Sequence, residues 1–555
     1  MEHVFAGAVL LATMATGASA AEHWLVRRGR PECVWFEGEP WRQGDGYLHQ
    51  AGVGHILWGA KVFGEGDARV RARLRIHDLG GSAASVVLGG ASHFGFEGGA
   101  GEMFVEGPLL GGETQLLGQT PVVEGETFEF EARLEGGGIT FLIDGLQVHR
   151  CSVPASEIGM VGLRPHRARM EVEELVVETH APVTEWEPLP HADVFVGGTG
   201  GYHTYRIPAL VVSDEGTVLA FCEGRTHNAR DHGDIDMMLR RSTDNGETWE
   251  RMQLVYDEDV AEAARGDGEA PPWAAEDITI GNPCPVVDRS TGRIWLPFCR
   301  DNDDVFVTFS DDDGLTWAEP RMITASVKPA DWGWYATGPG VGIQLRRGPH
   351  AGRLVIPCDH RERVDGESVM FSHVFYSDDH GQTWRLGGSV AQHTDESQVV
   401  ELTDGSLMIN CRNYWGRSGG RPDRGGMRAI ARSTDGGESW GELRFDDTLI
   451  EPVCQASFIR YSAEDRDGDR NRLLFSNPAS RHSRTQMTVR LSYDEGQTWP
   501  VSRLVHPGSA AYSCLAALPD GRIGLLYERD SYRRISFVAF DLQWLTEGAD
   551  TLAGG

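Results

Sequence analysis

Short runs in which hydrophobic and polar residues alternate fill the first part of the chain, between about residues 22 and 180. A period of two is the pattern of a strand with one buried face. Glycine-rich turns separate the clearest of these runs, which are Ala68–Ile76, Phe128–Leu134, Thr140–Asp144 and Val172–Val177. The stretch Ile139–Val148 predicts a hairpin around Asp144-Gly145, because Asp-Gly suits a two-residue turn. We therefore expect a β-sandwich in this region.

The rest of the chain repeats a different pattern, in which a strand-like run leads into the octet Ser-x-Asp-x-Gly-x-Thr/Ser-Trp. The octet occurs five times, beginning at Ser242, Ser310, Ser377, Ser433 and Ser492. The runs before these octets are Met237–Arg241, Val305–Phe309, His373–Tyr376, Arg428–Arg432 and Thr488–Leu491. Asp and Gly within the octet suit a tight turn, over which we expect the Trp to pack. The octet is similar to the Asp-box of β-propeller proteins, and a repeat of this length predicts stacked or radially arranged modules.

Strand–turn–strand units underlie the octets, and we count six: Tyr205–Cys222, Cys284–Cys299, Gly340–Cys358, Ser397–Cys411, Cys454–Phe475 and Tyr512–Tyr527. Five units are followed by an outer strand and an octet, and the last is followed by Ile535–Phe540 alone. Six modules with four short strands each predict a six-bladed β-propeller. We therefore predict an all-β chain with a signal peptide (1–21), a β-sandwich accessory domain (22–180), a linker (181–190), a propeller (191–545) and a tail (546–555).

The propeller topology predicts where a binding site lies. The first strand of each unit runs away from one rim and the second returns to it, so the residues that open and close a unit meet around the central axis. The opening positions hold Arg206, Glu396 and Tyr512, and the closing positions hold Arg225, Arg300, Arg361, Arg412 and Glu528. Arg484 follows the fifth unit shortly. Each arginine alone fits a surface or inter-blade ion pair, but the set predicts a site for a carboxylate or sulfate.

The overall charge narrows the choice of partner. The formal net charge is −31 over 555 residues, which argues against a nucleic-acid partner because phosphate would be repelled over most of the surface. Nearly all positive charge is arginine, since lysine occurs only at Lys61 and Lys328. A local arginine cluster is nevertheless compatible with an anionic ligand.

The N-terminus predicts export. An apolar stretch from Val4 to Met14 leads to Ala18-Ser19-Ala20, which fits a signal-peptide cleavage site, although the n-region carries Glu2 and His3 and no Lys or Arg. We therefore expect a secreted or periplasmic protein. No other run approaches the roughly 20 apolar residues of a membrane span.

Cysteines recur with the modules rather than as a disulfide framework. Four of the nine occupy matching places near the end of a strand, namely Cys222, Cys299, Cys358 and Cys411. A residue that recurs once per module at one position is expected to be a small buried packing group.

From about Phe195 to Phe540 the chain resembles the bacterial and animal sialidases. Tyr205-Arg206-Ile207-Pro208 is similar to the family's Arg-Ile-Pro motif, whose Arg is the first of three that hold the sialic acid carboxylate. Arg412, in DESQVVELTDGSLMINCR, looks like the second, and Arg484, shortly before MTVRLS, looks like the third. The predicted sandwich loosely resembles the concanavalin-like or laminin-G-like jelly rolls that are often attached to carbohydrate-active enzymes.

The same resemblance implies roles for further residues. Tyr512, in AYSCL, would be the nucleophile, and Glu396 would accept its proton. Glu528 would steady Arg206, and Arg225, in the family-like Glu-Gly-Arg, would line the far side of the pocket. A sialoside carries a carboxylate on the carbon that is attacked, which repels an anionic nucleophile but not a neutral phenol; sialidases with a tyrosine nucleophile are an exception to the two-carboxylate scheme. Because free tyrosine has a pKa of about 10, Glu396 has to take the proton as the bond forms.

By the same resemblance, the acid/base would lie in a loop with several aspartates, ARDHGDIDMML. The distance from Arg225 agrees best with Asp231 as the acid/base of the family's flexible loop, and Asp234 is the reserve. Asp236 opens the strand toward the first octet and is expected to be structural. His227 and His232 in this loop either touch substrate or are solvated.

Two further segments leave alternatives open. DWGWYATGPG, from Asp331, is either a wall for the sugar's N-acyl or glycerol side or a set of core aromatics at a blade junction. DRDGDRN from Asp465 and SDDDG from Ser310 superficially suggest calcium, but neither completes an EF-hand loop with its distal Glu. We predict no cofactor and no required metal.

Together these features predict a glycoside hydrolase, a retaining exo-α-sialidase that releases terminal sialic acids from sialylated glycans, glycoproteins or glycolipids. One alternative is a propeller lectin or adhesin that binds an acidic sugar without cleaving it. Another is a related glycosidase or transferase that acts on another anionic sugar, or an anhydro-forming variant that shares the same core. The arginines fit all of these, whereas Glu396, Tyr512 and Asp231 are needed only for turnover. Linkage preference and oligomeric state do not follow from the sequence.

Overall fold

A computed structural model of the chain describes residues 20–98, 101–152, 155–186, 188–258, 278–467, 469–481 and 483–552. Residues 1–19 of the predicted signal peptide lie outside this range. The chain divides into two compact units, Met1–Glu185 and Trp186–Gly555. In the described part of the chain, no helix is both long and apolar enough to cross a membrane.

The described part of the first unit forms two antiparallel sheets. One contains β1 (Ala21–Arg27), β2 (Arg30–Pro31), β4 (Arg42–Gln43), β5 (Leu48–Ala51), β7 (Ala68–His77), β12 (Thr127–Glu135), β13 (Gly138–Ile143), β14 (Leu146–Arg150) and β16 (Arg169–Thr179). The other contains β3 (Val34–Glu37), β6 (Ile56–Glu65), β8 (Ser85–Leu88), β9 (Ser92–Gly95), β10 (Glu102–Gly107), β11 (Gly112–Gln119), β15 (Glu157–Arg164) and β17 (Val183–Glu185), with the short η1 (Pro108–Leu110) after β10.

The alternation of apolar and polar residues along the strands explains how these two sheets pack. In β7 the side chains of Val70, Ala72, Leu74 and Ile76 are buried in a core that takes residues from both sheets, whereas the arginines between them face outward. The predicted runs form β7, β12, β13 and β16, and the predicted hairpin joins β13 to β14. Asp144 and Gly145 both have positive φ, 49° and 77°, as a two-residue turn of this kind requires.

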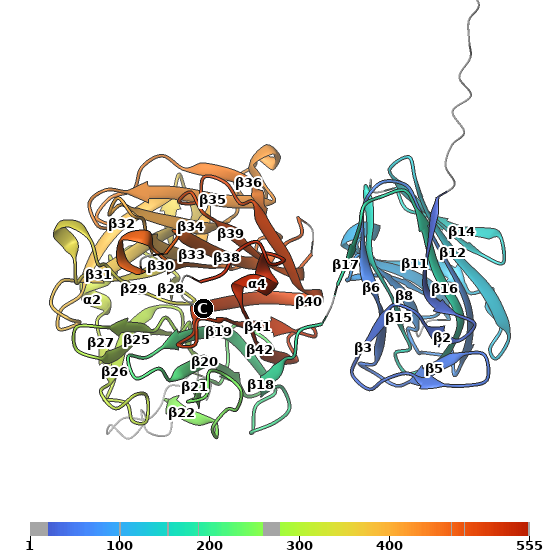
Figure 1. Cartoon of the computed structure of the whole chain (residues 1–555), viewed down its shortest axis with the longest axis horizontal. Helices are drawn as coiled ribbons and strands as arrows, with labels where there is room; N and C mark the ends of the chain where they lie inside the picture. Colours follow the sequence, from blue (N-terminus) through green and yellow to red (C-terminus); the bar gives the residue numbers. More distant parts are fainter. Residues whose placement is uncertain are drawn as a thin grey trace, which may run out of the picture. The chain divides into compact units, whose positions relative to one another are not determined.

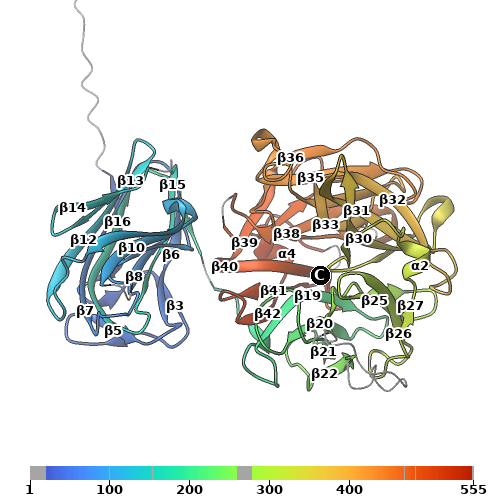
Figure 2. The same cartoon turned by 180° about the vertical axis from the view of Figure 1, so that it is seen from behind.

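The second unit is a succession of small antiparallel sheets arranged around a common centre, like the blades of a propeller (Figures 1 and 2). The first described sheets contain β19 (Thr204–Val212), β20 (Val218–Arg225), β21 (Ile235–Ser242) and β22 (Gln253–Tyr256), and then β23 (Ile280–Gly281), β24 (Val286–Asp288), β25 (Arg293–Arg300), β26 (Asp304–Ser310) and β27 (Arg321–Met322). The next contain β28 (Tyr335–Thr337), β29 (Ile343–Gln344), β30 (Leu354–Val364), β31 (Glu367–Ser377) and β32 (Arg385–Gln392), and then β33 (Thr394–Glu401), β34 (Leu407–Asn413), β35 (Met427–Ser433) and β36 (Arg444–Ile450).

The last described sheet combines β18 (Ala192–Val196) with β37 (Ser457–Ser462), β38 (Arg472–Pro478), β39 (Thr485–Ser492), β40 (Val501–Ala517), β41 (Ile523–Arg529) and β42 (Arg534–Phe540). The long strand β40 pairs with β39 through its first half and with β41 through its second half. At the edge of this sheet β18 pairs with β42, so the beginning and the end of the unit meet. The short helices are α2 (Thr324–Val327), α3 (Glu464–Asp467), α4 (Leu542–Leu545), η2 (Gly348–His350) and η3 (Pro422–Arg424).

Each octet forms the predicted tight turn after a strand. In the first copy, Asp244 Oδ1 accepts hydrogen bonds from Ser242 Oγ (2.7 Å) and from the backbone N–H of Thr248 (2.9 Å), and the other four copies repeat these contacts. The octet tryptophans contact aromatic rings in strands, some in a neighbouring sheet and some, such as Phe375 for Trp384, in the strand before their own octet. Trp249 lies 5.3 Å from the ring of Phe537 in β42, and Trp317 lies 5.6 Å from that of Phe221 in β20, so each contacts a sheet other than its own. The octets therefore join neighbouring sheets.

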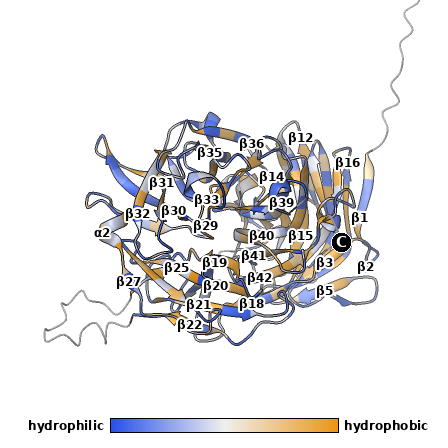
Figure 3. Cartoon of the chain, turned by 60° about the vertical axis from the view of Figure 1, so that its left-hand side comes forward, coloured by the Kyte–Doolittle hydropathy of each residue, from blue (hydrophilic) through white to orange (hydrophobic). Residues whose placement is uncertain are grey.

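The predicted strand–turn–strand pairs are all present among the described strands. The third differs in its start, because its first strand is split into β28 and β29 at Gly338-Pro339, where proline has no N–H for the ladder. Hydrophobic residues gather in the strands, and many connecting loops are hydrophilic (Figure 3). All nine cysteines lie in the described ranges and are free, and the four recurring ones are buried as predicted.

Candidate active site

A pocket of about 200 Å³ lies where the strands of the second unit open and close. Its lining includes the predicted residues Arg206, Arg225, Asp231, Arg361, Glu396, Arg412, Arg484 and Tyr512. Arg300 does not line the pocket: its guanidinium pairs with Glu258 at 2.9 Å and with Asp304 at 2.6 Å. The prediction for that arginine was wrong, because Asp304 of its own sheet and Glu258, just after β22, bind its charge.

Irregular strand pairing aims the central side chains. The register shifts between Arg206 and Ala209 in β19, between Thr394 and Ser397 in β33, and between Ala510 and Ser513 in β40. A bulge bends the strand and turns side chains that regular alternation would point elsewhere. Arg206, Glu396 and Tyr512 each lie within or at the edge of such a shift, and all three reach the pocket.

Three guanidinium groups surround the ring and hydroxyl of Tyr512. Arg412 Nη1 donates to Tyr512 Oη at 3.0 Å. The guanidinium carbons of Arg206 and Arg484 lie 5.4 Å and 5.5 Å from the centre of the Tyr512 ring. The structure therefore brings together the three arginines that the sequence singled out, from strands β19 and β34 and the segment just before β39.

Glu528 lies behind this group, with no exposed side-chain surface. It accepts from Arg206 Nε at 2.6 Å and from the backbone N–H groups of Ile207 (2.9 Å) and Tyr512 (3.1 Å). One carboxylate of β41 thus fixes both the Arg206 side chain and the backbone that carries Tyr512. Ile207 has a φ of 61°, a strained value for a β-branched residue that these bonds help to hold.

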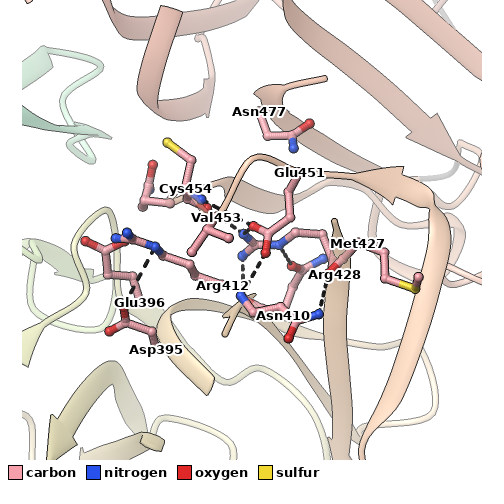
Figure 4. A network of polar contacts seen from close by, with 12 residues as sticks. Asp395, Glu396, Asn410, Arg412, Met427, Arg428, Glu451, Val453, Cys454 and Asn477 are labelled. Atoms are coloured by element: carbon pink, nitrogen blue, oxygen red, sulfur yellow. Dashed lines mark hydrogen bonds and ion pairs between the residues drawn. The ribbon is translucent and has the colours of Figure 1, made fainter. Parts of the chain in front are cut away.

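Glu396 and Tyr512 are directly hydrogen-bonded, with the phenol as donor. The other carboxylate oxygen of Glu396 accepts from Arg412 Nη1 at 2.7 Å, and Figure 4 shows this approach. Burial and the charge of Glu396 raise the pKa of Tyr512 well above its ordinary value, and Arg412 and Arg484 only partly counteract them. The phenol is therefore neutral at physiological pH and has a carboxylate in place to accept its proton.

Asp231 reaches the pocket from the loop between β20 and β21. Its Oδ1 lies 2.9 Å from Arg225 Nη1 and 3.8 Å from Arg206 Nη1, and its side chain is 67% exposed. Burial opposes ionisation, but the charges of Arg225 and Arg206 outweigh it and hold the pKa of Asp231 below its usual range. Asp234 is not part of the lining; its nearest ionic contact is His227, at 3.9 Å.

The aromatic segment from Asp331 is divided between the pocket and the core. Trp334 lines the pocket and donates from Nε1 to Asp359 at 3.0 Å. His232, next to Asp231, contacts the Trp334 ring edge-on at 5.7 Å. Trp332 stacks on His360 and Tyr335 is buried, so these two rings belong to the core.

Comparison with known proteins places this chain in a family. The sequence model of the BNR repeat-like domain matches residues 216–525, more than half of the chain. An exo-alpha-sialidase of Aspergillus fumigatus is 32% identical over 402 residues, which cover 63% of this chain and 86% of that protein. The chain belongs to the sialidase family. A sialidase of Micromonospora viridifaciens is 40% identical over 382 residues, covering 65% of this chain and 55% of that relative, so the chain matches little more than half of its length.

A solved structure supports the same family assignment. The Hadza microbial sialidase Hz136 is similar to this sialidase-family chain with a TM-score of 0.56 and 26% identity, over 87% of this chain and 96% of that one.

Carboxyl groups that sequence reasoning missed complete the lining. Glu223 bonds to Arg225 through Oε2 at 2.6 Å, and Asp359 and Asp395 lie beside Glu396. Burial and the charges of Asp395 and Glu396 raise the pKa of Asp359 well above its ordinary value. Glu223 was detectable, because it precedes Arg225 by two residues and so shares its strand face. Asp395 was not, because only the bulge in β33 brings it to the same pocket as its neighbour Glu396.

The balance of charges favours an anionic ligand at one end of the pocket. Arg206 and Arg412 already have carboxylate partners, whereas Arg484 contacts Tyr532 Oη (3.0 Å) and the carbonyl of Val453 (3.3 Å). In the described part of the chain, no carboxylate lies within ion-pair distance of Arg484. Within the same range, no group of three or more His, Cys, Asp or Glu side chains fits a metal ion. The pocket therefore combines an arginine that can bind an anion, the buried Tyr512 phenol with Glu396 as its base, and the exposed carboxyl group of Asp231.

Proposed function

We propose that this chain is a retaining exo-α-sialidase, a glycoside hydrolase that releases terminal sialic acids from glycoconjugates. The observation that carries the proposal is the convergence of Arg206, Arg412 and Arg484 on the buried Tyr512–Glu396 pair. An anion site alone would not require a phenol hydrogen-bonded to a carboxylate, and a catalytic pair alone would not require three guanidinium groups around it.

The arginines select a sugar with a carboxylate next to its reacting carbon. Charge-assisted hydrogen bonds contribute roughly 1.5–3 kcal/mol each, so three guanidinium groups supply both affinity and a fixed orientation of the ring. Arg484 brings a positive charge that has no carboxylate partner among the described residues. The substrate carboxylate would provide that partner. This charge balance is the reason for preferring an acidic sugar over a neutral one.

Tyr512 is the proposed nucleophile. Its Oη attacks the anomeric carbon as the glycosidic C–O bond breaks, and its proton passes to Glu396, with which it is already hydrogen-bonded. Arg412, 3.0 Å from the same oxygen, stabilises the negative charge that develops there. A neutral phenol also avoids the repulsion that a carboxylate nucleophile would meet from the substrate carboxylate.

Asp231 is the proposed acid/base. It donates a proton to the departing glycosidic oxygen, and in the second step it takes a proton from water as that water attacks the anomeric carbon. The bond to Tyr512 breaks as the bond to water forms, and the departing phenolate recovers its proton from Glu396. Two displacements at one carbon leave the anomeric configuration of the released sugar unchanged.

The proposal extends to the architecture and the location of the chain. The second unit would be a six-bladed propeller, in which β18 and β37–β42 form two blades that share β40, and the other four described sheets form one blade each. The first unit would be a β-sandwich accessory domain of jelly-roll type, supported by two sheets around one core. The leader-like residues near the N-terminus support export as a secreted or periplasmic protein.

The decisive variant is Tyr512→Phe, assayed on a fluorogenic sialoside. Loss of the nucleophile should lower kcat by roughly a thousandfold or more, while the affinity for free sialic acid changes by no more than about tenfold, because the arginines remain. Tyr461→Phe is the matched control: its hydroxyl binds the carbonyl of Gly521, away from the pocket, and kcat should be unchanged.

Product analysis separates the alternatives. If the wild type binds sialic acid but releases none from any sialoside, the chain is a lectin rather than an enzyme. NMR of the first product should show the anomer present in the substrate; the opposite anomer would exclude the covalent tyrosyl route.

A further inference from the structure

A buried ion pair lies next to the pocket without lining it. Arg428, in β35, and Glu451, just after β36, have no exposed side-chain surface, and their Nη1 and Oε2 atoms are 2.6 Å apart. Figure 4 shows the pair beside Asn410 and Cys454, with Arg412 and Glu396 further along. Neither residue touches the reacting groups, so the proposed chemistry does not explain them.

The pair connects two separate segments of backbone. Glu451 accepts from the N–H of Asn413 at 2.8 Å, at the end of β34. Arg428 Nη1 donates to the carbonyl of Cys454 at 2.7 Å, and its Nε donates to Asn410 Oδ1 at 2.6 Å. One charged pair thus holds the end of β34 against the turn that leads from β36 to β37.

Each of these segments holds one arginine of the pocket. Arg412 directly precedes Asn413, whose N–H binds Glu451. In the turn, the carbonyl of Val453 accepts from Arg484 Nη2 at 3.3 Å. Val453 has a φ of 58°, which is unfavourable for a β-branched residue and persists only where its surroundings impose it.

The turn also supports the tyrosine. Cys454 is buried in a small cluster with Ile207, Ala511 and Tyr512. The segment tied down by Arg428 and Glu451 therefore contacts the Arg484 side chain on one side and packs against Tyr512 on the other.

We propose that Arg428 and Glu451 are positioning residues, which hold Arg412 and Arg484 in the geometry that lets both bind one substrate carboxylate beside Tyr512. The inference rests on the proposed function of the pocket. Buried ion pairs contribute little net stability compared with apolar residues of the same volume, so stability alone is a weak reason for one here. A small displacement of a binding group remote from the chemistry is enough to lower activity by about a hundredfold.

The test compares Glu451→Gln with a matched variant of another buried pair. Arg472 and Asp550 are 0% and 4% exposed and bond at 2.7 Å, but neither lines the pocket. Glu451→Gln should lower kcat/KM on a fluorogenic sialoside by about ten- to a hundredfold, mostly through KM, whereas Asp550→Asn should leave it within twofold. Crystal structures should show Arg412 Nη1 moving away from Tyr512 Oη, now 3.0 Å distant, only in Glu451→Gln.

Amide hydrogen exchange provides a readout that does not depend on activity. The Asn413 N–H should exchange faster in Glu451→Gln and unchanged in Asp550→Asn, because only the former weakens its acceptor. If Glu451→Gln fails to fold, the double variant Arg428→Gln/Glu451→Gln removes both charges together and should still show the faster exchange and the higher KM.

The possible results separate the two proposals. Unchanged kcat/KM and an unchanged Arg412–Tyr512 distance in a folded Glu451→Gln protein would overturn the positioning role. A wild type that neither cleaves nor binds sialosides would overturn the proposed function. In that case the Arg412–Tyr512 distance and the Asn413 exchange rate in Glu451→Gln would still decide whether the pair positions the arginines.

Discussion

Glu528→Gln is the most direct test of how the pocket is held together. The substitution keeps the shape of the side chain but removes a negative charge that is fully buried beside Arg206, itself only 8% exposed. Arg206 would keep its positive charge, since a guanidinium does not lose its proton in a protein. The variant therefore leaves a buried cation without its closest counterion.

The structure sets the size of the expected effect. Removing one partner of a buried ion pair typically destabilises a protein by about 3–5 kcal/mol. Glutamine still offers one oxygen to the N–H groups of Ile207 and Tyr512, now 2.9 Å and 3.1 Å from the carboxylate, so these bonds are only partly lost. We expect a loss of about 3–5 kcal/mol in the free energy of unfolding, together with weaker binding of sialic acid.

Urea denaturation followed by tryptophan fluorescence measures the first quantity, and calorimetric titration with sialic acid measures the second. The control is Glu247→Gln, which breaks the exposed pair with Arg522 and should change stability by less than about 1 kcal/mol. If Glu528→Gln is as stable as this control and binds sialic acid normally, the idea that Glu528 holds Arg206 and Tyr512 in place is wrong.

Two further predictions concern pH. Arg225→Gln removes a positive charge that lowers the pKa of Asp231, so the protonated acid persists to higher pH. The alkaline limb of the kcat/KM profile should therefore shift to higher pH. A limb that stays in place or shifts to lower pH contradicts the role of Asp231. In the fourth octet, burial works against ionisation of Asp435, but hydrogen bonds from Ser439 and Ser433 outweigh it and lower the pKa to about 2. The ionised Asp435 carboxylate stabilises the fold at pH values above 3.8, its ordinary pKa, and this contribution is lost as the pH falls toward 2. Asp435→Asn should therefore flatten the curve of unfolding free energy against pH between these two values. An unchanged slope would refute this prediction.

Local patterns predicted the strands and turns because the forces that shape them act within a few residues. The hairpin at Asp144-Gly145 and the turns of the octets form as expected, since the bonds that define them lie inside the motif. The direction of the octet tryptophans could not be predicted in this way. Trp249 packs on Phe537, which is nearly 300 residues away, and only the closed arrangement of sheets brings the two together.

The sequence predicted those site residues that lie at the ends of the paired strands. Most of the rim residues of the repeated units line the pocket; Arg300 does not, because nearer carboxylates bind it, and Glu528 lies behind the lining, where it holds Arg206. Asp395 was missed because strict alternation places neighbouring residues on opposite faces, whereas the bulge in β33 brings Asp395 and Glu396 to one pocket. Glu451 was missed because it lies outside every repeated pattern.

The pairing of β18 with β42 affects how the second unit is made. Asp193 binds Arg534 across this pair although 341 residues separate them, so the earliest strand of the unit must wait for the last one to be synthesised. Until then Phe195 and Phe537, both buried in the finished sheet, have incomplete surroundings. Contacts this distant in sequence close slowly, which makes completion of the ring a late event in folding. During that interval the nascent chain is most exposed to aggregation and to proteases.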